Sequence, residues 1–266
     1  MALADGNITI KLSDLTPDWL RANWLTGLEF IDRAGKPYPD SFFETHMQNA
    51  LRKLEKLCDI SILEVVITDE QHDYYAQDYI NWGWLQLFKV PVKSITQLRG
   101  VFPLGVSIVT YPPEWIQIRK DSGELNVVPN QGALSAVIIG QGGDFLPILY
   151  QGISSVPNLW RVDYIAGMDP LDLPRMIVEA LAKLACIDLL RIMSDLVRPI
   201  GVNSESASID GLSQSMSYQL PAFQARISQY SEDLYGPAGK SQELTMTSGL
   251  LKQILDAYKP INMVST

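Results

Sequence analysis

The stretch Trp160-Arg-Val-Asp-Tyr-Ile-Ala-Gly-Met-Asp-Pro-Leu-Asp-Leu-Pro-Arg-Met-Ile-Val-Glu-Ala-Leu-Ala182 passes from the pattern of a strand to that of a helix. The run Leu159–Ile165 is rich in apolar residues and is followed by a glycine at position 167, which predicts a strand. Pro174 suits the first turn of a helix, and the helical pattern continues to Val197, before an Arg-Pro pair that stops it. Few positions of this helix are polar, so we expect it to be buried on several sides.

A second long helix is predicted from Ser41 to Cys58. Ser41 and Glu44 have the spacing of a capping box. The apolar residues recur at the spacing of one helix face, namely Phe43, Met47, Ala50, Leu51, Leu54, Leu57 and Cys58. We expect this helix to pack on the helix Pro174–Val197, with a common core of Leu51, Leu54, Ile177, Leu181 and Leu184.

Shorter helices are predicted at both ends of the chain. One lies within Leu12–Ile31, before the chain-breaking Gly35, Pro37 and Pro39. Two more follow the second long helix. The first begins after Pro221 with Phe223, Ile227, Tyr230 and Leu234 on one face, and the last contains Leu250, Leu251, Ile254, Leu255 and Tyr258.

Residues 60–165 have a different character. Short apolar and β-branched runs alternate there with Gly, Pro and Asn clusters, which predicts a mostly antiparallel β region. Its clearest hairpin joins Trp115–Arg119 to Glu124–Val128 through Asp121-Ser-Gly123. The predicted fold class is α+β, a helical bundle core with a large inserted antiparallel β-rich region. We expect residues 1–59 to form the N-terminal part of the core, 60–165 the insertion, 166–236 the long helices and a Ser/Gly-rich arm, and 237–266 a C-terminal extension with a short helix.

The composition bears on assembly. Charged residues make up 19% of the 266 residues, below the roughly 25% of soluble globular proteins, and the chain has six Trp and eleven Tyr. Two explanations fit these values equally well: a large core within one monomer, or surface covered by neighbouring subunits, where aromatic residues are enriched and charges depleted.

The charge balance argues against a protein that binds the phosphate backbone of nucleic acid. Lys and Arg number 21 against 30 Asp and Glu, for a formal net charge of −9. The densest basic clusters are Arg52-Lys53 with Lys56, and Arg119-Lys120, too small for a phosphate-binding footprint. An acidic wall can still surround DNA without binding it, because like charges repel.

The sequence holds no motif that specifies a reaction, so we do not expect an enzyme. It has no G-x-S-x-G motif, and Cys58 and Cys186 fall on helical patterns and are predicted to be buried structural thiols. The glycines of Gly140-Gln-Gly-Gly143 are not followed by the Lys-Ser/Thr of a phosphate-binding loop. We therefore predict no catalytic residue and no cofactor.

The two histidines, His46 and His72, lack the paired spacing of a zinc site. His72 lies in Asp69-Glu-Gln-His-Asp73, which we interpret as a solvated connection between strands rather than a site for a divalent cation. No metal is predicted. The first residues lack the basic and apolar regions of a signal peptide, and the charges within Met176–Val197 argue against a membrane span.

Three stretches together resemble the head–tail connector (adaptor, or neck) proteins of tailed bacteriophages. They are the helix that follows Asp40, the strand that ends in the Tyr-x-Ala-Gly pattern at residues 164–167, and the helix that follows Leu173-Pro174. The β hairpin between residues 114 and 129 is also similar to inserted regions of phage structural proteins. Simpler members of the family are shorter and mainly helical, so the inserted region is the main departure.

The resemblance implies a structural virion protein, synthesised in the host bacterial cytoplasm and located in the neck of the virion. Its implied partners are the portal protein, tail or neck proteins and copies of itself in a ring of twelve, with genomic DNA passing through the lumen without specific binding and no contact with membrane. One alternative is another virion protein, for neck or tail completion or for fibre attachment, that docks through the β region. A hydrolase that uses Asp, Glu or His of that region is the third hypothesis.

The segment Gly201–Ser217 is rich in Ser and Gly and is predicted to be an extended arm or a long loop. It offers little apolar surface to offset the entropy of ordering, so it would become ordered only against a partner. The residues that would anchor such an arm are Ile209, Leu212, Met216 and Tyr218. An ordinary solvent loop explains the composition equally well.

Overall fold

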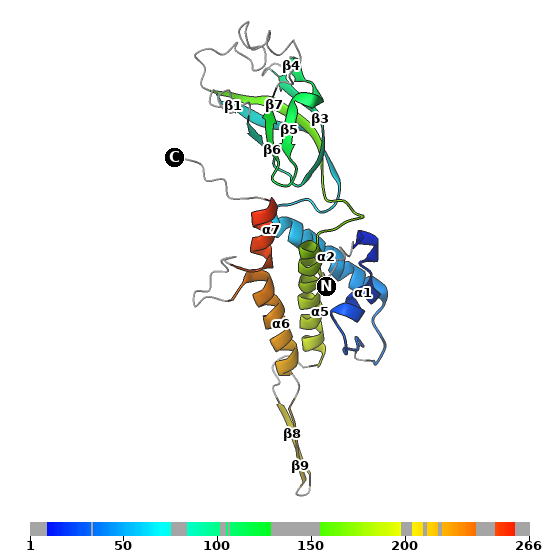
Figure 1. Cartoon of the computed structure of the whole chain (residues 1–266). Helices are drawn as coiled ribbons and strands as arrows, with labels where there is room; N and C mark the ends of the chain where they lie inside the picture. The colour runs from blue at the N-terminus through cyan, green and yellow to red at the C-terminus, as the bar shows by residue number, and fades with distance from the viewer. Residues whose placement is uncertain are drawn as a thin grey trace, which may run out of the picture. The chain divides into compact units, whose positions relative to one another are not determined.

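The computed structural model describes residues 10–32, 34–75, 84–101, 105, 107–128, 155–197, 204–209, 212–217, 220–237 and 248–258. The chain divides into two compact units (Figure 1). A helical unit comprises Met1–Cys58 and Pro170–Leu255, and a β unit comprises Asp59–Asp169 together with Asp256–Thr266. The predicted fold class is confirmed: the fold is α+β, with antiparallel sheets inserted between the helices of the core.

Helix α5 (Arg175–Val197) is the central element of the helical unit, and α2 (Asp40–Cys58) packs against it. Leu54, Ile177, Leu181 and Leu184 are buried, as the predicted core requires, while Leu51 is half-buried at its margin. The burial of α5 extends around most of its circumference, because consecutive residues from 180 to 187 are all buried. This confirms the packing expected from the apolar patterns of the two helices.

Helices α6 (Leu220–Tyr235) and α7 (Leu250–Tyr258) follow in the chain, and α6 lies beside α5 (Figure 1). Gly236 ends α6 with a positive φ of 90°, a conformation that glycine adopts without strain. The helical piece predicted within Leu12–Ile31 is shorter than the pattern suggested. It consists of a 3-10 turn, η1 (Leu12–Asp14), and α1 (Pro17–Asn23), whose first turn is capped by the Thr16 hydroxyl.

The capping box predicted at Ser41 is wrong. Helix α2 begins at Asp40, so Ser41 lies inside the first turn, where its carbonyl accepts a hydrogen bond from the Thr45 hydroxyl. The start of the helix is fixed instead by Pro39, whose carbonyl accepts from the Phe42 amide, and by an ion pair between Asp40 and Arg21 at 2.8 Å. A capping residue must precede the first helical residue, and Ser41 does not.

The described residues of the β unit form two antiparallel sheets. The four-stranded sheet has the order β1-β7-β3-β4, and the three-stranded sheet has the order β2-β6-β5. Their bounds are β1 Val65–Tyr75, β2 Leu85–Gln86, β3 Val92–Val101, β4 Ser107–Tyr111, β5 Ile116–Arg119, β6 Glu124–Val127 and β7 Ser155–Ala166, with a 3-10 turn η2 at Pro113–Trp115. A core of large buried side chains, including Trp160, Tyr164, Leu98 and Leu125, belongs to both sheets.

The predicted hairpin of β5 and β6 is confirmed, with Gly123 at a φ of 73° in its turn. Strand β1 includes the acidic stretch around His72, so the prediction that this stretch is a connection between strands is wrong. Two irregularities in the pairing of β1 with β7 lie within this strand, after Ile67 and after His72. The glycine run 140–143 lies outside the described residues.

Candidate functional site

Strands β8 (Ser204–Ile209) and β9 (Leu212–Ser217) form an antiparallel ribbon between α5 and α6. Of the two alternatives for this segment, the long loop is wrong. The described residues have the extended backbone that the other alternative predicted. A signal for the hairpin is present in the sequence, since Asp210-Gly211 separates two runs of equal length and such dipeptides favour the tight turns of hairpins. The Ser-rich composition obscured it.

The register of the ribbon sorts its residues into two sets of positions. Ile209 opposes Leu212 and Glu205 opposes Met216, while Ser208 opposes Ser213. Because directly opposed residues share a face and neighbours alternate, one face carries only serine positions. The other, which we term the apolar face of the ribbon, carries Ala207, Ile209, Leu212 and Met216 together with Glu205 and Gln214.

The structure thus brings three of the four predicted anchor residues, Ile209, Leu212 and Met216, to one face of one ribbon. Tyr218 lies outside the described residues. No described strand other than β8 and β9 pairs in this sheet. An isolated two-stranded hairpin is at best marginally stable in water, so a ribbon with an apolar face is suited to bind another surface.

Helices α5 and α6 are joined by a buried charge. Lys183 on α5 is 8% exposed and lies 2.7 Å from Glu179 and 2.9 Å from Asp233 of α6. Burial alone would lower the pKa of Lys183, but the hydrogen bonds to these two carboxylates raise it. The Tyr230 hydroxyl of α6 also donates to the backbone carbonyl of Trp24, 3.1 Å away. These contacts fix α6 against α5, which lies beside it (Figure 1), and against the residue that follows α1.

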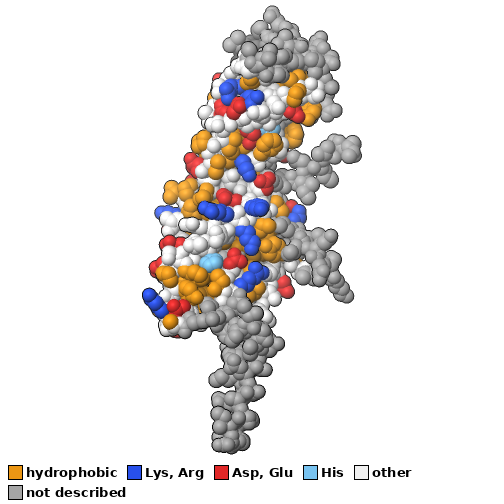
Figure 2. Space-filling view, turned by 180° about the vertical axis from the view of Figure 1, so that it is seen from behind, with side chains coloured by type: hydrophobic (Ala, Val, Ile, Leu, Met, Phe, Trp, Pro, Cys, Tyr) orange, Lys and Arg blue, Asp and Glu red, His pale blue; other side chains and the backbone are white. Residues whose placement is uncertain are grey.

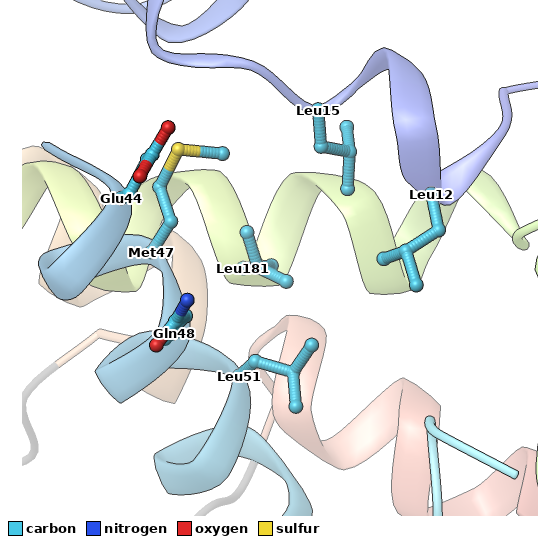
Figure 3. A pocket seen from close by; sticks show the side chains of 7 residues that line it. All are labelled: Leu12, Leu15, Glu44, Met47, Gln48, Leu51 and Leu181. Atoms are coloured by element: carbon cyan, nitrogen blue, oxygen red, sulfur yellow. The ribbon is translucent and has the colours of Figure 1, made fainter. Parts of the chain in front are cut away.

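The helical unit also has an open apolar pocket, which we term the α2 groove (Figure 3). Its volume is about 160 Å³. Glu44 and Gln48 of α2 contribute its polar part, and both are exposed. Its apolar lining comes from the segment before α1, from α2 and from α5, namely Leu12, Leu15, Met47, Leu51 and Leu181.

In the β unit, the acidic stretch predicted to be a solvated connection forms a buried polar network. Glu70 Oε1 lies 2.8 Å from His72 Nε2 and accepts a 3.0 Å hydrogen bond from the Phe88 amide. Glu70 Oε2 accepts a 2.6 Å hydrogen bond from the Tyr164 hydroxyl, which itself accepts from the Lys89 amide. The side chains of Glu70 and His72 are only 7% and 9% exposed, so the carboxylate is enclosed by its donors.

The electrostatics of this network match a structural role. Burial by itself raises the pKa of Glu70, but hydrogen bonds from His72, Tyr164 and the Phe88 amide outweigh it and lower the pKa below its ordinary value. Burial and the hydrogen bond to Glu70 raise the pKa of Tyr164. Within the described part of the chain, no group of three or more His, Cys, Asp and Glu side chains is arranged to hold a metal.

The network and the packing of the β unit explain the Tyr-x-Ala-Gly pattern at residues 164–167. Tyr164 binds Glu70, and Ala166 is fully buried between β1 and β3. Gly167 has a φ of 134°, and a Cβ atom there would lie 2.7 Å from the Glu64 Cα. Each position is therefore required by the packing of the β unit, and none of the three needs a reaction to explain it.

Strand β1 is an edge of the four-stranded sheet and carries exposed apolar side chains. Val66 is 67% exposed, and Val65 and Tyr75 are also exposed. Phe88, 57% exposed, has its ring 4.6 Å from that of His72. Exposed apolar side chains along a sheet edge are a suitable surface for a protein partner.

Charged side chains of the same sheet neutralise one another. Arg99 and Arg161 oppose each other on β3 and β7 and pair with Asp163 at 3.1 Å and Asp69 at 2.6 Å respectively. Figure 2 shows one face of the molecule, on which Lys and Arg side chains are interspersed with Asp and Glu. This distribution provides no continuous basic surface on that face for a phosphate backbone.

The two cysteines are free and buried, as predicted. Burial raises the pKa of Cys58 to about 11 and that of Cys186 to about 12, so both remain protonated thiols at neutral pH. None of the described helices has the length and hydrophobicity needed to span a bilayer.

No family model and no curated protein matches the chain. Among solved structures, one similar chain comes from "Virion of native gene transfer agent (GTA) particle", with 15% identity, a TM-score of 0.39, and coverage of 90% of this chain and 97% of that chain. Another comes from "Neck of empty GTA particle computed with C6 symmetry", with 16% identity, a TM-score of 0.36, and coverage of 86% and 92%.

Proposed function

We propose that this protein is a structural virion protein of a tailed phage, a head–tail connector subunit that forms a ring of twelve copies between portal and tail. The observation that carries the proposal is the β8–β9 ribbon, which places three apolar anchor positions on one face and pairs with no other described strand. A subunit of a closed ring needs one surface for each neighbour, and a projecting ribbon supplies one of them.

Two further observations support a structural role. The stretches that resemble connector proteins all have a role in packing. Helices α2 and α5 form the helical core, and residues 164–167 are packed within the β unit. The buried Glu70–His72–Tyr164 network has the residue types of a catalytic site, but both oxygens of the Glu70 carboxylate are occupied by hydrogen bonds within the β unit.

In the proposed ring, the lumen surrounds DNA without binding it. The net charge is −9, and an acidic surface repels the phosphate backbone and allows it to slide. The portal protein and tail or neck proteins are the proposed partners above and below the ring. The subunit would act in the neck of the virion, after synthesis in the bacterial cytoplasm.

A second candidate function is favoured by the edge of the four-stranded sheet. The exposed apolar side chains of β1, together with Phe88, suit a neck, tail-completion or fibre-attachment protein that docks through the β unit. In that case the chain would bind its partner as a monomer or a small oligomer rather than as a closed ring.

Particle mass separates the two candidates. We expect native mass spectrometry and negative-stain electron microscopy of the purified chain, alone and mixed with the portal protein of the same phage, to show closed twelvefold rings. A monomer under both conditions would contradict the connector proposal and favour docking through the β unit.

The connector proposal also predicts weak DNA binding. With its acidic balance and only small basic clusters, the free protein should bind duplex DNA weakly or not at all at moderate salt. Fluorescence anisotropy with a labelled duplex, measured over a salt series, tests this. Submicromolar, salt-sensitive binding would overturn it and indicate a nucleic-acid function.

A further inference from the structure

The α2 groove is bordered by positively charged residues of the same helix. Gln48, which lines the groove, is followed at intervals of four residues by Arg52 and Lys56. Residues at this spacing lie one above the other on a helix, so the two cations continue one edge of the groove for two turns. Lys53 lies next to Arg52, and all three basic residues are exposed. We term Arg52, Lys53 and Lys56 the basic edge of the groove.

The basic edge has no counter-ion among the described residues. None of its three side chains forms an ion pair or a hydrogen bond with another residue in the described part of the chain, whereas Lys183 on α5 is paired twice. The stretch 52–56 contains one carboxylate, Glu55, which is half-buried, so cations outnumber it three to one. In a protein with a formal net charge of −9, this group of unpaired cations is suited to an acidic partner.

The lining of the groove supplies an apolar surface beside these charges. Five of its seven residues are Leu or Met. Figure 3 shows Leu12 and Leu15 on one side of the space and Leu51 of α2 on the other. The volume of about 160 Å³ is enough for an aliphatic side chain, since an apolar cavity of about 150 Å³ admits benzene. The surface as a whole therefore combines an apolar groove with a positively charged border.

We propose that the α2 groove and its basic edge bind an acidic amphipathic helix of a partner protein. The apolar face of that helix enters the groove, and carboxylates beside this face pair with the basic edge. The site lies on α2 and does not depend on the ribbon that carries the connector proposal.

The polar groups of the groove favour a helix over an extended segment. Backbone N–H and C=O groups need hydrogen-bond partners when a surface covers them. Among the lining residues, only the side chains of Glu44 and Gln48 are polar, too few for an extended backbone. A helix satisfies its backbone internally and presents apolar side chains at i, i+3, i+4 and i+7. The part of α2 that lines the groove, from Glu44 to Leu51, is about 10 Å long, which matches two turns of a bound helix.

Charge also sets the direction of the bound helix. Glu44 lies at one end of the α2 lining, and the basic edge begins beyond the other end, after Leu51. Carboxylates of the partner gain attraction beside Arg52 and Lys56 and are repelled beside Glu44. The acidic residues of the bound helix are therefore expected at the end that lies against Arg52 and Lys56.

Peptides of defined chemistry test the site in the full-length chain. The acidic probe is a fluorescein-labelled peptide of about 18 residues, or five helical turns, with Leu on one face and Glu on both sides of it. A second peptide has Lys in place of each Glu, and a third has the composition of the acidic probe in an order without an apolar face. Fluorescence anisotropy should show the acidic probe binding at least about tenfold more tightly than either of the others. The net charge of −9 alone would favour the Lys peptide, so this preference requires the basic edge.

Charge reversal on the basic edge should remove the preference. Arg52→Glu combined with Lys56→Glu is expected to weaken binding of the acidic probe about tenfold and to strengthen binding of the Lys peptide. The matched control combines Lys36→Glu with Lys120→Glu, which changes the net charge equally at two exposed residues outside the groove. It should bind the acidic probe nearly as well as the wild type does. Circular dichroism of each variant establishes that the chain is folded.

A third variant tests the apolar part of the site. Leu15 is half-buried, lines the groove and lies outside the core of α2 and α5. Leu15→Ala should weaken binding of the acidic probe about threefold to tenfold while leaving every charge in place.

Several results would overturn the proposal. They are tighter binding of the Lys peptide by the wild type, equal binding of the ordered and reordered acidic peptides, and unchanged binding by the charge-reversed chain. Duplex DNA that bound the wild type more tightly than the acidic probe, and was lost on charge reversal, would instead make the basic edge a phosphate-binding surface. Self-association lost on charge reversal, without peptide binding, would make a second copy of the chain the occupant. The connector proposal is tested separately, by particle mass.

Discussion

Leu54→Asp is expected to abolish soluble expression of the protein. Leu54 is fully buried on α2, in the core that this helix forms with α5. Removing a buried leucine side chain costs about 2–5 kcal/mol, and an unpaired carboxylate in an apolar site adds several more. The total is comparable to the whole stability of an ordinary domain, about 5–15 kcal/mol. The fraction of protein in the soluble cell extract is the measurement.

Asn49→Asp is the matched control for this prediction. Asn49 is exposed on the same helix, and the change adds the same charge without removing buried surface. We expect wild-type yield and melting temperature from it, while Leu54→Ala should give soluble protein destabilised by about 2–5 kcal/mol. If Leu54→Asp were soluble and melted as the wild type does, α2 would not contribute to the core described here.

The helices could be predicted from the spacing of their apolar residues, because the buried face of a helix repeats every three to four residues along the sequence. The spacing of Phe43, Met47, Ala50 and Leu54 marks the buried face of α2, and the sparse polar positions of α5 reflect burial on several sides. The same signal does not define helix ends. The first turn of α2 depends on Pro39 and on the ion pair of Asp40 with Arg21, a residue nineteen positions away.

The buried network of β1 could not be predicted from a local pattern. Five consecutive polar residues, 69 to 73, have the composition of a loop. They form a strand because the Glu70 carboxylate is hydrogen-bonded to His72 and also to Tyr164, which is 94 positions away in the sequence. Long-range pairing of this kind leaves no periodic signal. The β8–β9 ribbon, by contrast, had a local signal in Asp210-Gly211 that its serine-rich strands obscured.

Replacement of Glu70 by alanine is expected to destabilise the β unit by about 2–4 kcal/mol at neutral pH. The change leaves His72, the Tyr164 hydroxyl and the Phe88 amide without their common acceptor. Each buried polar group that loses its partner costs about 1–3 kcal/mol, and relaxation of His72 and Tyr164 recovers part of this. Gln71→Ala is the control, since Gln71 is the exposed neighbour on the same strand.

The Glu70 carboxylate should also make the stability of the β unit depend on pH. The pKa of Glu70 in the folded protein is lower than its ordinary value of 4.5. Its ionisation therefore contributes stability that is fully present above the ordinary pKa and is lost as the pH falls through the folded pKa. Glu70→Gln keeps the shape of the side chain but cannot ionise, so this part of the acid sensitivity should disappear in that variant.

Chemical denaturation followed by tryptophan fluorescence measures both effects, because Trp160 is 1% exposed in the core of the β unit. The free energies of unfolding of wild type, Glu70→Gln and Glu70→Ala should be compared at neutral pH and through the acid range. We expect the difference between wild type and Glu70→Gln to shrink as the pH falls below the ordinary glutamate value. A difference that stayed constant with pH would mean that the pKa of Glu70 is the same in the folded and the unfolded protein, which would contradict this prediction.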